Sequence, residues 1–374
     1  MYCAPVLAPV AAPLLGVAPA TVGYFVTAAY LGSMIGTVTA GGWVARFGPI
    51  RVSQAGMLLC GCGLAVAASG SGAAVLAGAV LIGLGYGPAT PASSVILARA
   101  APPGMLALTF SIKQTGVPLG TAIAGALVPV LVLALGWQGA ALAIGIVCAC
   151  VGVAVAPLRR DYDRERNPVA PVSLRSAFAP VLLVLRDRRI AQLSFISLVY
   201  GGIQITFVAY LVAFLTESFA LSLVLAGLVM SASQLASVAG RIVWGVVADR
   251  ALSRRTTLGL LGVGMGLAAL AALTATPAWP LWAMFAFATA LGATAVGWNG
   301  VFLAELTRLA PSGRIGDVTG GSAFFTFLGV VATPPLFHLV LTLTSSYGIT
   351  YALFGIPAFL AGAFLLLTDR IADR

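Results

Sequence analysis

Two stretches, GGWVARFG at residues 41–48 and GVVADRAL at residues 245–252, decide how this chain is organised. Each stretch ends a long apolar run, and their glycines and arginines align at an offset of 204 residues. A second pair, RAAP at 99–102 and RLAP at 308–311, ends two further apolar runs at an offset of 209 residues. Matches at equivalent run ends in both halves predict a duplicated helical unit.

The composition indicates that lipid is the solvent of most of the chain. Of its 374 residues, 60% are apolar and 8% are charged, and the mean hydropathy is +1.06. A soluble domain carries roughly 25% charged residues. A membrane-spanning helix needs about 20 mostly apolar residues, so the length accommodates about twelve such helices and no separate soluble domain.

Twelve apolar runs follow one another along the chain, and we interpret each as one membrane helix. They span residues 2–16, 20–44, 52–69, 73–98, 106–135, 138–157, 190–215, 221–248, 256–275, 279–304, 319–343 and 347–368. The first is short for a complete span. The runs and the internal duplication predict an all-α membrane protein with twelve transmembrane helices in two pseudo-symmetric six-helix bundles.

The arginines predict the orientation. Eighteen of the 20 basic residues follow even-numbered runs, and the loops after odd-numbered runs contain no lysine or arginine. Because positive charge accumulates in cytoplasmic loops, both termini are expected at the cytoplasmic face of a plasma (inner) membrane. An arginine-rich linker at 158–189 separates the bundles at 1–157 and 190–374. Part of it, around 173–189, is expected to form an amphipathic helix on the membrane surface.

The two remaining basic residues, Lys113 and Arg241, lie inside predicted helices. At 1.5 Å per residue they lie about 10 and about 12 Å from the cytoplasmic ends of those helices. No acidic residue lies inside a predicted helix to neutralise them, and two facing cations repel each other unless an anion joins them. Each residue could instead anchor its helix by reaching the headgroups, or pair with backbone carbonyls.

Over its whole length the sequence resembles the major facilitator superfamily. The family's loop after helix 2 reads G-x-x-x-D-R-x-G-[RK]-[RK], which Gly41, Arg46, Gly48 and Arg51 match, whereas Ala45 occupies the acidic position. The equivalent loop after helix 8, GVVADRALSRR, keeps the acid. The resemblance implies a major facilitator fold and a cytoplasmic charge lock, for which the candidate residues are Asp249, Arg250, Glu305 and Arg46. The departure at Ala45 puts the N-terminal counterpart of this lock in doubt.

The segment AGRIVWG at 239–245 is similar to helix 8 of organic-anion members of this family, in which an arginine contacts the substrate carboxylate. The resemblance places Arg241 in that role. Oxalate exchangers carry a second basic residue on helix 11, and its absence here argues against oxalate itself. The family architecture also places helices 5 and 8 opposite each other, which makes Lys113 a second candidate contact.

Further polar side chains are candidates for the lining of a substrate cavity, because helices 1, 4, 7 and 10 surround the cavity in this family. They are Tyr86, Gln204 and Asn299, together with Gln114 beside Lys113. The alternative for each is a hydrogen bond between helices.

Several function classes are excluded. The chain has one histidine, and its cysteine pairs are spaced so that they cannot share a metal, so no metal, cofactor or catalytic residue is expected. The net charge of +10 comes from arginines in the loops that set the orientation in the membrane, and it does not indicate nucleic-acid binding. We expect a monomeric secondary active transporter that moves a small organic anion, a mono- or dicarboxylate, by alternating access, with proton or counter-anion coupling open. The alternative is a proton-driven exporter of drugs or other lipophilic compounds, which the lack of an intramembrane acid disfavours.

Overall fold

The computed structural model describes residues 22–170, 178–221 and 223–372, together with Leu7, Ala11, Leu14 and Gly16. Within these residues the chain folds as helices joined by turns and short loops, and it forms no strand. Eleven of the twelve predicted runs fall on helices, and the run at 2–16 lies almost entirely outside the described residues. Nine segments of the described chain are long and apolar enough to cross a membrane.

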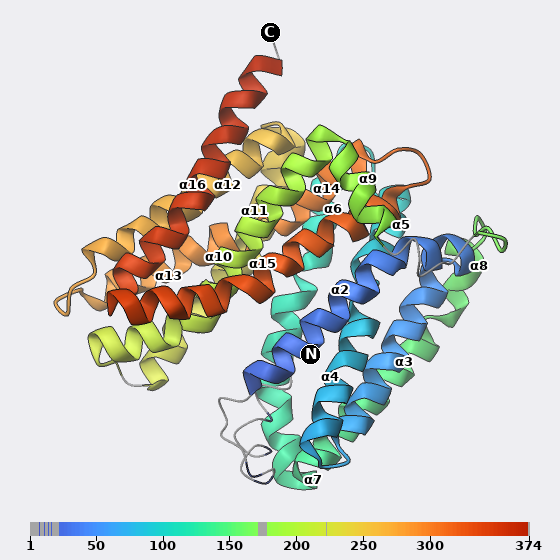
Figure 1. Cartoon of the computed structure of the whole chain (residues 1–374), viewed down its shortest axis with the longest axis horizontal. Helices are drawn as coiled ribbons and strands as arrows, with labels where there is room; N and C mark the ends of the chain where they lie inside the picture. The colour runs from blue at the N-terminus through green and yellow to red at the C-terminus, as the bar shows by residue number, and fades with distance from the viewer. Residues whose placement is uncertain are drawn as a thin grey trace. The chain divides into compact units, whose positions relative to one another are not determined.

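The helices divide between two compact units, which Figure 1 colours by residue number. Unit 1 comprises the described residues of Met1–Arg99, Leu119–Ala191 and Ala310–Phe327. Its elements are α2 (Val22–Phe47), α3 (Pro49–Ala67), α4 (Gly72–Tyr86), α5 (Ala89–Ala100), most of α7 (Gly116–Ala154), η2 (Ala156–Leu158), α8 (Arg159–Tyr162), α9 (Ala179–Arg186) and the start of α15 (Ile315–Thr344). Within it α4 packs against both α2 and α3 (Figure 1).

Unit 2 comprises the described residues of Ala100–Pro118, Gln192–Leu309 and Leu328–Arg374. Its elements are α6 (Leu106–Gln114), most of α10 (Arg188–Phe219), α11 (Leu223–Arg250), α12 (Arg254–Ala271), η4 (Ala272–Thr274), α13 (Leu281–Ala295), α14 (Asn299–Leu309), the remainder of α15 and α16 (Tyr347–Ala372). The units differ from the predicted halves in two places. Helix α6 groups with unit 2 because it packs on α11 and α14, and the start of α15 groups with unit 1.

Small residues let these helices approach one another closely. A Cβ added to either Gly56 of α3 or Gly85 of α4 would overlap the backbone oxygen of the other. Helices surrounded by lipid gain little from burying apolar surface against one another, so close backbone packing of this kind carries much of their association. The abundance of glycine in the apolar runs therefore serves the packing of each unit.

Three predicted runs are interrupted rather than continuous. The run at 73–98 breaks between α4 and α5 beside Pro88, the run at 106–135 breaks at Thr115, and the run at 279–304 breaks at 296–298. The predicted boundary between 135 and 138 coincides with Gly136, whose φ of 69° divides α7 into two helices. Glycine adopts this left-handed conformation without a Cβ clash.

The linker is largely part of unit 1. The Asp163 carboxylate accepts hydrogen bonds from the backbone N–H groups of Ile50 (2.8 Å) and Arg51 (3.3 Å) at the start of α3. The Asn167 N–H donates to the Ala45 carbonyl at 2.8 Å. These bonds fix the segment that follows α8 against the beginning of α3.

Helix α9 lies where the sequence predicts a helix on the membrane surface, and that location stays a prediction. It covers Ala179–Arg186, and residues 173–177 of the predicted element lie outside the described residues. Its apolar residues Pro180, Val181 and Val184 are buried within unit 1. Gly321 of α15 permits this packing, because a Cβ there would overlap the Pro180 carbonyl. These apolar residues therefore contact protein, whereas Leu182 and Leu185 of the same helix are 55% and 45% exposed.

Candidate functional site

Helix α6, which carries Lys113, is held unusually close to α11 and α14. A Cβ added to Gly245 of α11 would lie 2.8 Å from the Ser111 Oγ, and one added to Gly300 of α14 would overlap Ser111 itself. Contacts below 3.0 Å are not found for real Cβ atoms, so only glycine fits at these positions. The two glycines thereby fix the end of α6 on the helices that carry Arg241 and Asn299.

The break between α6 and α7 follows from Pro118. Proline has no N–H group, so it cannot donate to the carbonyl four residues earlier in a helix. That carbonyl belongs to Gln114, the last residue of α6. A buried carbonyl without a donor costs about 1–3 kcal/mol. The sequence of α6 and α7 therefore creates a requirement for a donor from another element.

Arg241 of α11 supplies that donor. Its side chain is only 2% exposed, its Nη1 donates to the Gln114 carbonyl, and its Nε donates to the Val296 carbonyl at 2.9 Å. Val296 directly follows α13, at the break that precedes α14. The partial negative charge at the C-terminal end of a helix stabilises a guanidinium group placed there. Arg241 thus joins the ends of α6 and α13 to α11, which corresponds to the expected alternative of pairing with backbone carbonyls.

Lys113 lies in the same unit and within range of the charge of Arg241. It is half-buried, and its Nζ donates to the Gln114 Oε1 at 3.0 Å. An ammonium group has three donors. Gln114 therefore links the two cations, because its side chain accepts from Lys113 and its carbonyl accepts from Arg241.

The described acids of unit 2 are engaged at other places. Glu217 accepts from the Tyr347 hydroxyl at 3.0 Å, and Glu305 accepts from Arg308 at 2.6 and 2.8 Å. Asp249 lies at the opposite end of α6, as described below. None of these three carboxylates forms an ion pair with Lys113.

A second polar cluster holds the other side of the break at 296–298. The Gln204 Oε1 on α10 accepts from the Trp298 Nε1 at 3.0 Å and from the Asn299 Nδ2 at 3.1 Å. Trp298 is 1% exposed, and its ring packs edge-on against Tyr200 at 5.6 Å. The break is consequently joined to α10 through Gln204 and to α11 through Arg241.

Unit 2 thus contains five of the six predicted substrate contacts. These are Arg241, Lys113, Gln114, Gln204 and Asn299. The sixth, Tyr86, belongs to unit 1, where its ring lies 6.4 Å from that of Phe327. The structure also adds Trp298 and Pro118 to the elements that hold the site, and sequence reasoning missed Pro118. The spacing of Gln114 and Pro118 by four residues could have revealed this proline.

The predicted lock residue Asp249 caps the N-terminus of α6. Its carboxylate, 2% exposed, accepts from the backbone N–H groups of Ala107 (3.0 Å) and Leu108 (2.8 Å). Arg254 donates to it at 3.2 Å. A carboxylate at a helix N-terminus satisfies N–H groups that have no partner within the helix and interacts favourably with the helix dipole.

The other predicted lock residues make different contacts. Glu305 pairs with Arg308 one turn away on the same helix, and the Arg46 guanidinium lies 5.5 Å from the centre of the Phe47 ring. Arg250 is exposed at the end of α11. A lock that combines all four residues stays a prediction, and the carboxylate cap of Asp249 is the contact of this group that joins two helices.

Unit 1 also has a carboxylate at a helix N-terminus, but this acid lies on the helix itself rather than in the loop after α2. Gly41, at the position equivalent to Gly245, packs against the start of α15, where an added Cβ would overlap the Asp317 carboxylate. Asp317 lies in the first turn of α15 and pairs with Arg314. The loop after α2 has Ala45 at the acidic position of the motif. An acid, Asp317, is instead present in the first turn of α15, where a negative charge stabilises the helix N-terminus.

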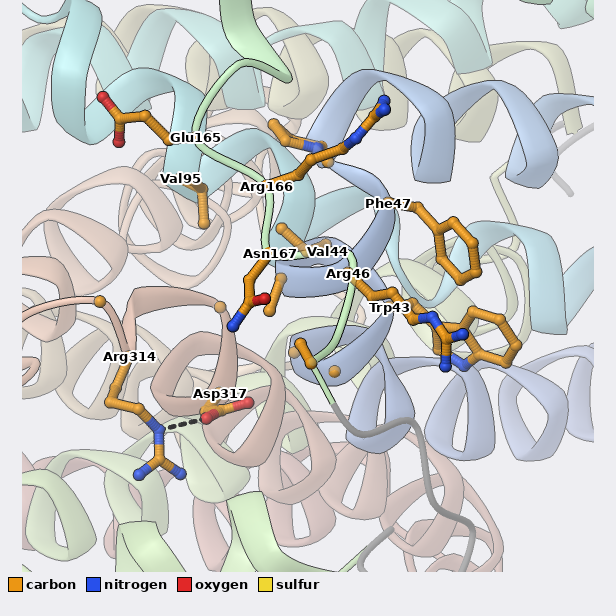
Figure 2. A pocket seen from close by; sticks show the side chains of 18 of the residues that line it. Trp43, Val44, Arg46, Phe47, Val95, Glu165, Arg166, Asn167, Arg314 and Asp317 are labelled. Atoms are coloured by element: carbon orange, nitrogen blue, oxygen red, sulfur yellow. Dashed lines mark hydrogen bonds and ion pairs between the residues drawn. The ribbon is translucent and has the colours of Figure 1, made fainter.

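Figure 2 shows the hollow that surrounds these residues in unit 1. It has a volume of about 1030 Å³ and lies among the end of α2, the linker and the start of α15. The Trp43 and Phe47 rings stack at 5.5 Å on one side, and the Arg314–Asp317 pair lies on the other (Figure 2). Arg99, which also lines it, pairs with Glu165 at 2.9 Å.

A family model for the Major Facilitator Superfamily matches residues 1–334. The chain belongs to this superfamily. It is accordingly a multi-pass membrane transporter rather than an enzyme, and the predicted fold class is confirmed. No match was found among curated protein sequences.

Solved structures of major facilitator transporters share the fold at low sequence identity. An E. coli fucose:proton symporter, FucP, matches with a TM-score of 0.74 and 15% identity over 97% of this chain and 95% of its own. The human organic anion transporter MFSD10 (TETRAN) gives 0.73 and 19% over 92% and 83%. The proton:xylose symporter XylE gives 0.70 and 17% over 97% and 90%. Identities this low show a common fold and leave the substrate open.

Proposed function

We propose that this protein is a secondary active transporter of a small organic anion, a mono- or dicarboxylate. The observation that supports it is Lys113 of unit 2, whose ammonium forms no ion pair with an acid in the described part of the chain and lies within range of the charge of Arg241. An anion beside Lys113 relieves the repulsion between the two cations and is held by charge-assisted hydrogen bonds. Transport by alternating access between the cytoplasm and the far side of a plasma membrane, with both termini cytoplasmic, completes the proposal.

The two cations take different roles in it. Lys113 contacts the anion directly, with the Gln114 amide beside it. Arg241 bonds to the ends of α6 and α13, and its positive charge attracts the anion without a direct contact. Gln204 and Asn299 position the break at 296–298, and Tyr86 remains a candidate from the resemblance to the family.

A neutral sugar is the competing substrate class, because two of the similar structures belong to a fucose and a xylose symporter. A lipophilic drug is the other alternative. Uptake into proteoliposomes separates the classes when radiolabelled mono- and dicarboxylates, fucose, xylose and a lipophilic cation are compared under imposed proton and anion gradients. Accumulation of a sugar or the cation without any anion would contradict the proposal.

Lys113→Gln tests the site itself. Loss of a charge-assisted contact worth about 1.5–3 kcal/mol raises the KM for the anion about 10-fold or more. Lys113→Arg keeps the charge and retains most of the affinity. Arg188→Gln removes an exposed arginine at the start of α10 and serves as the control. Unchanged anion uptake in Lys113→Gln would refute the role of Lys113.

A further inference from the structure

A second hollow in unit 1 is lined almost entirely by arginine. It has a volume of about 410 Å³, and its lining residues are Arg51, Arg159, Arg160, Asp163, Arg164, Arg166 and Pro168. Five arginines and one aspartate line it, so its lining has a formal net charge of +4. Excess charge of this density requires either solvent or an anionic ligand.

The single acid of the hollow is already committed. Asp163 is 3% exposed, and its carboxylate accepts from the Ile50 and Arg51 N–H groups and, at 3.5 Å, from the Arg51 Nη1. Its negative charge is thus directed to the beginning of α3 and to one of the five arginines. Arg160 and Arg166 form no ion pair with any acid in the described part of the chain.

Part of the arginine cluster is positioned by buried groups. The Arg159 Nε donates to the Gln54 Oε1, and the Gln54 Nε2 donates to the Gly152 carbonyl at 2.5 Å. Gln54 is 5% exposed. Two arginines, Arg51 and Arg159, are therefore held by buried side chains of α3 and the linker. A preorganised set of this kind loses less side-chain entropy when it binds a ligand.

The hollow lies where membrane-spanning segments end. The apolar span Pro49–Ala67 begins there, and the apolar span Val130–Tyr162 ends there. Leu158 and Val169, adjacent in sequence to the cluster, are 43% and 85% exposed. Arginines and exposed apolar side chains thus lie together at a membrane boundary, which is the depth of phospholipid phosphate groups.

We propose that this hollow binds the phosphate head group of an acidic phospholipid, such as phosphatidylglycerol or cardiolipin. Guanidinium groups bind phosphate oxygens in a two-pronged geometry, and basic pockets at the cytoplasmic ends of membrane helices suit anionic head groups. The exposed apolar residues beside the cluster contact the acyl chains. A free phosphate shares the charge chemistry and lacks the apolar contact, which is the reason for assigning the site to a lipid.

The test uses the full-length protein in detergent and measures thermal stabilisation and native mass spectra with added phosphatidylglycerol, cardiolipin, phosphatidylcholine or inorganic phosphate. Arg160→Gln with Arg166→Gln removes two charges without removing a described side-chain bond. Arg188→Gln with Arg189→Gln removes two exposed arginines of unit 1 that do not line the hollow and is the matched control.

The expected result is that the two acidic lipids bind and stabilise, and that phosphatidylcholine does not. At about one kcal/mol for each basic residue near a membrane surface, the first double variant raises the apparent Kd for acidic lipid about 30-fold. The control variant changes it less than about threefold. An equal loss in both double variants would show general electrostatic attraction and overturn the site, and equal stabilisation by inorganic phosphate would overturn the assignment to lipid.

Discussion

The bond between Arg241 and the Gln114 carbonyl makes a quantitative prediction about Pro118. Arg241→Met leaves the Gln114 and Val296 carbonyls without this donor at a cost of about 1–3 kcal/mol each. Removing a buried charge returns part of that cost, because its desolvation no longer has to be offset. We therefore expect Arg241→Met to lower the free energy of unfolding by about 2–4 kcal/mol.

Pro118→Ala should recover part of this loss. Alanine at 118 restores an N–H group that can bond to the Gln114 carbonyl, so the double variant is expected to regain about 1–2 kcal/mol relative to Arg241→Met. Residues that share a partner show such coupling in a double-mutant cycle. Unfolding in mixed detergent micelles, followed by tryptophan fluorescence, measures each corner of the cycle.

Pro357 provides the control, since it lies inside α16 and its missing N–H concerns a different carbonyl. Pro357→Ala combined with Arg241→Met should give the sum of the two single effects. Equal additivity in the Pro118 cycle would refute the argument, because it would show that Arg241 does not replace the bond that proline removes.

Two further predictions concern the ends and the packing of α6. Asp249→Ala removes the buried carboxylate that accepts from the N-terminal N–H groups of α6 and should cost about 2 kcal/mol. Asp187→Ala removes an exposed N-cap of α10 and should cost about 1 kcal/mol or less. Equal melting temperatures for the two variants would contradict the importance of burial. Gly300→Ala forces a methyl group into Ser111 and should lower the free energy of unfolding by about 1–3 kcal/mol. The control Gly227→Ala in α11 meets nothing within 4 Å and should be neutral or stabilising. Thermal unfolding measures both, and a neutral Gly300→Ala would show that α6 can shift.

The helices were predictable from sequence because lipid demands long apolar runs with internally bonded backbones. The breaks at Thr115 and at 296–298 were not, since the apolar pattern continues across both. Grouping α6 with the second unit also escaped prediction. It depends on the contact of Ser111 with Gly245 and Gly300, and a run of small residues does not reveal its partner.

The sequence likewise identified Arg241 and Lys113 as unusual without identifying their contacts. Every residue has a backbone carbonyl, so the sequence could predict carbonyl acceptors for Arg241 but could not say which residues supply them. Side-chain acids are visible in a sequence, and Asp249 was found for that reason. Its acceptor role at Ala107 and Leu108 was not predicted, because a family motif names the residue and not the helix end that it caps.

The attachment of the linker has a practical consequence for protein engineering. A flexible glycine-serine spacer of equal length would keep the two halves tethered, yet it would remove Asp163 and leave the Ile50 and Arg51 N–H groups without their acceptor. It would also remove the α9 contact with Gly321. Residues 158–170 and 178–186 therefore count as structure rather than tether, and split or spliced versions of this transporter should retain them with the first half of the chain.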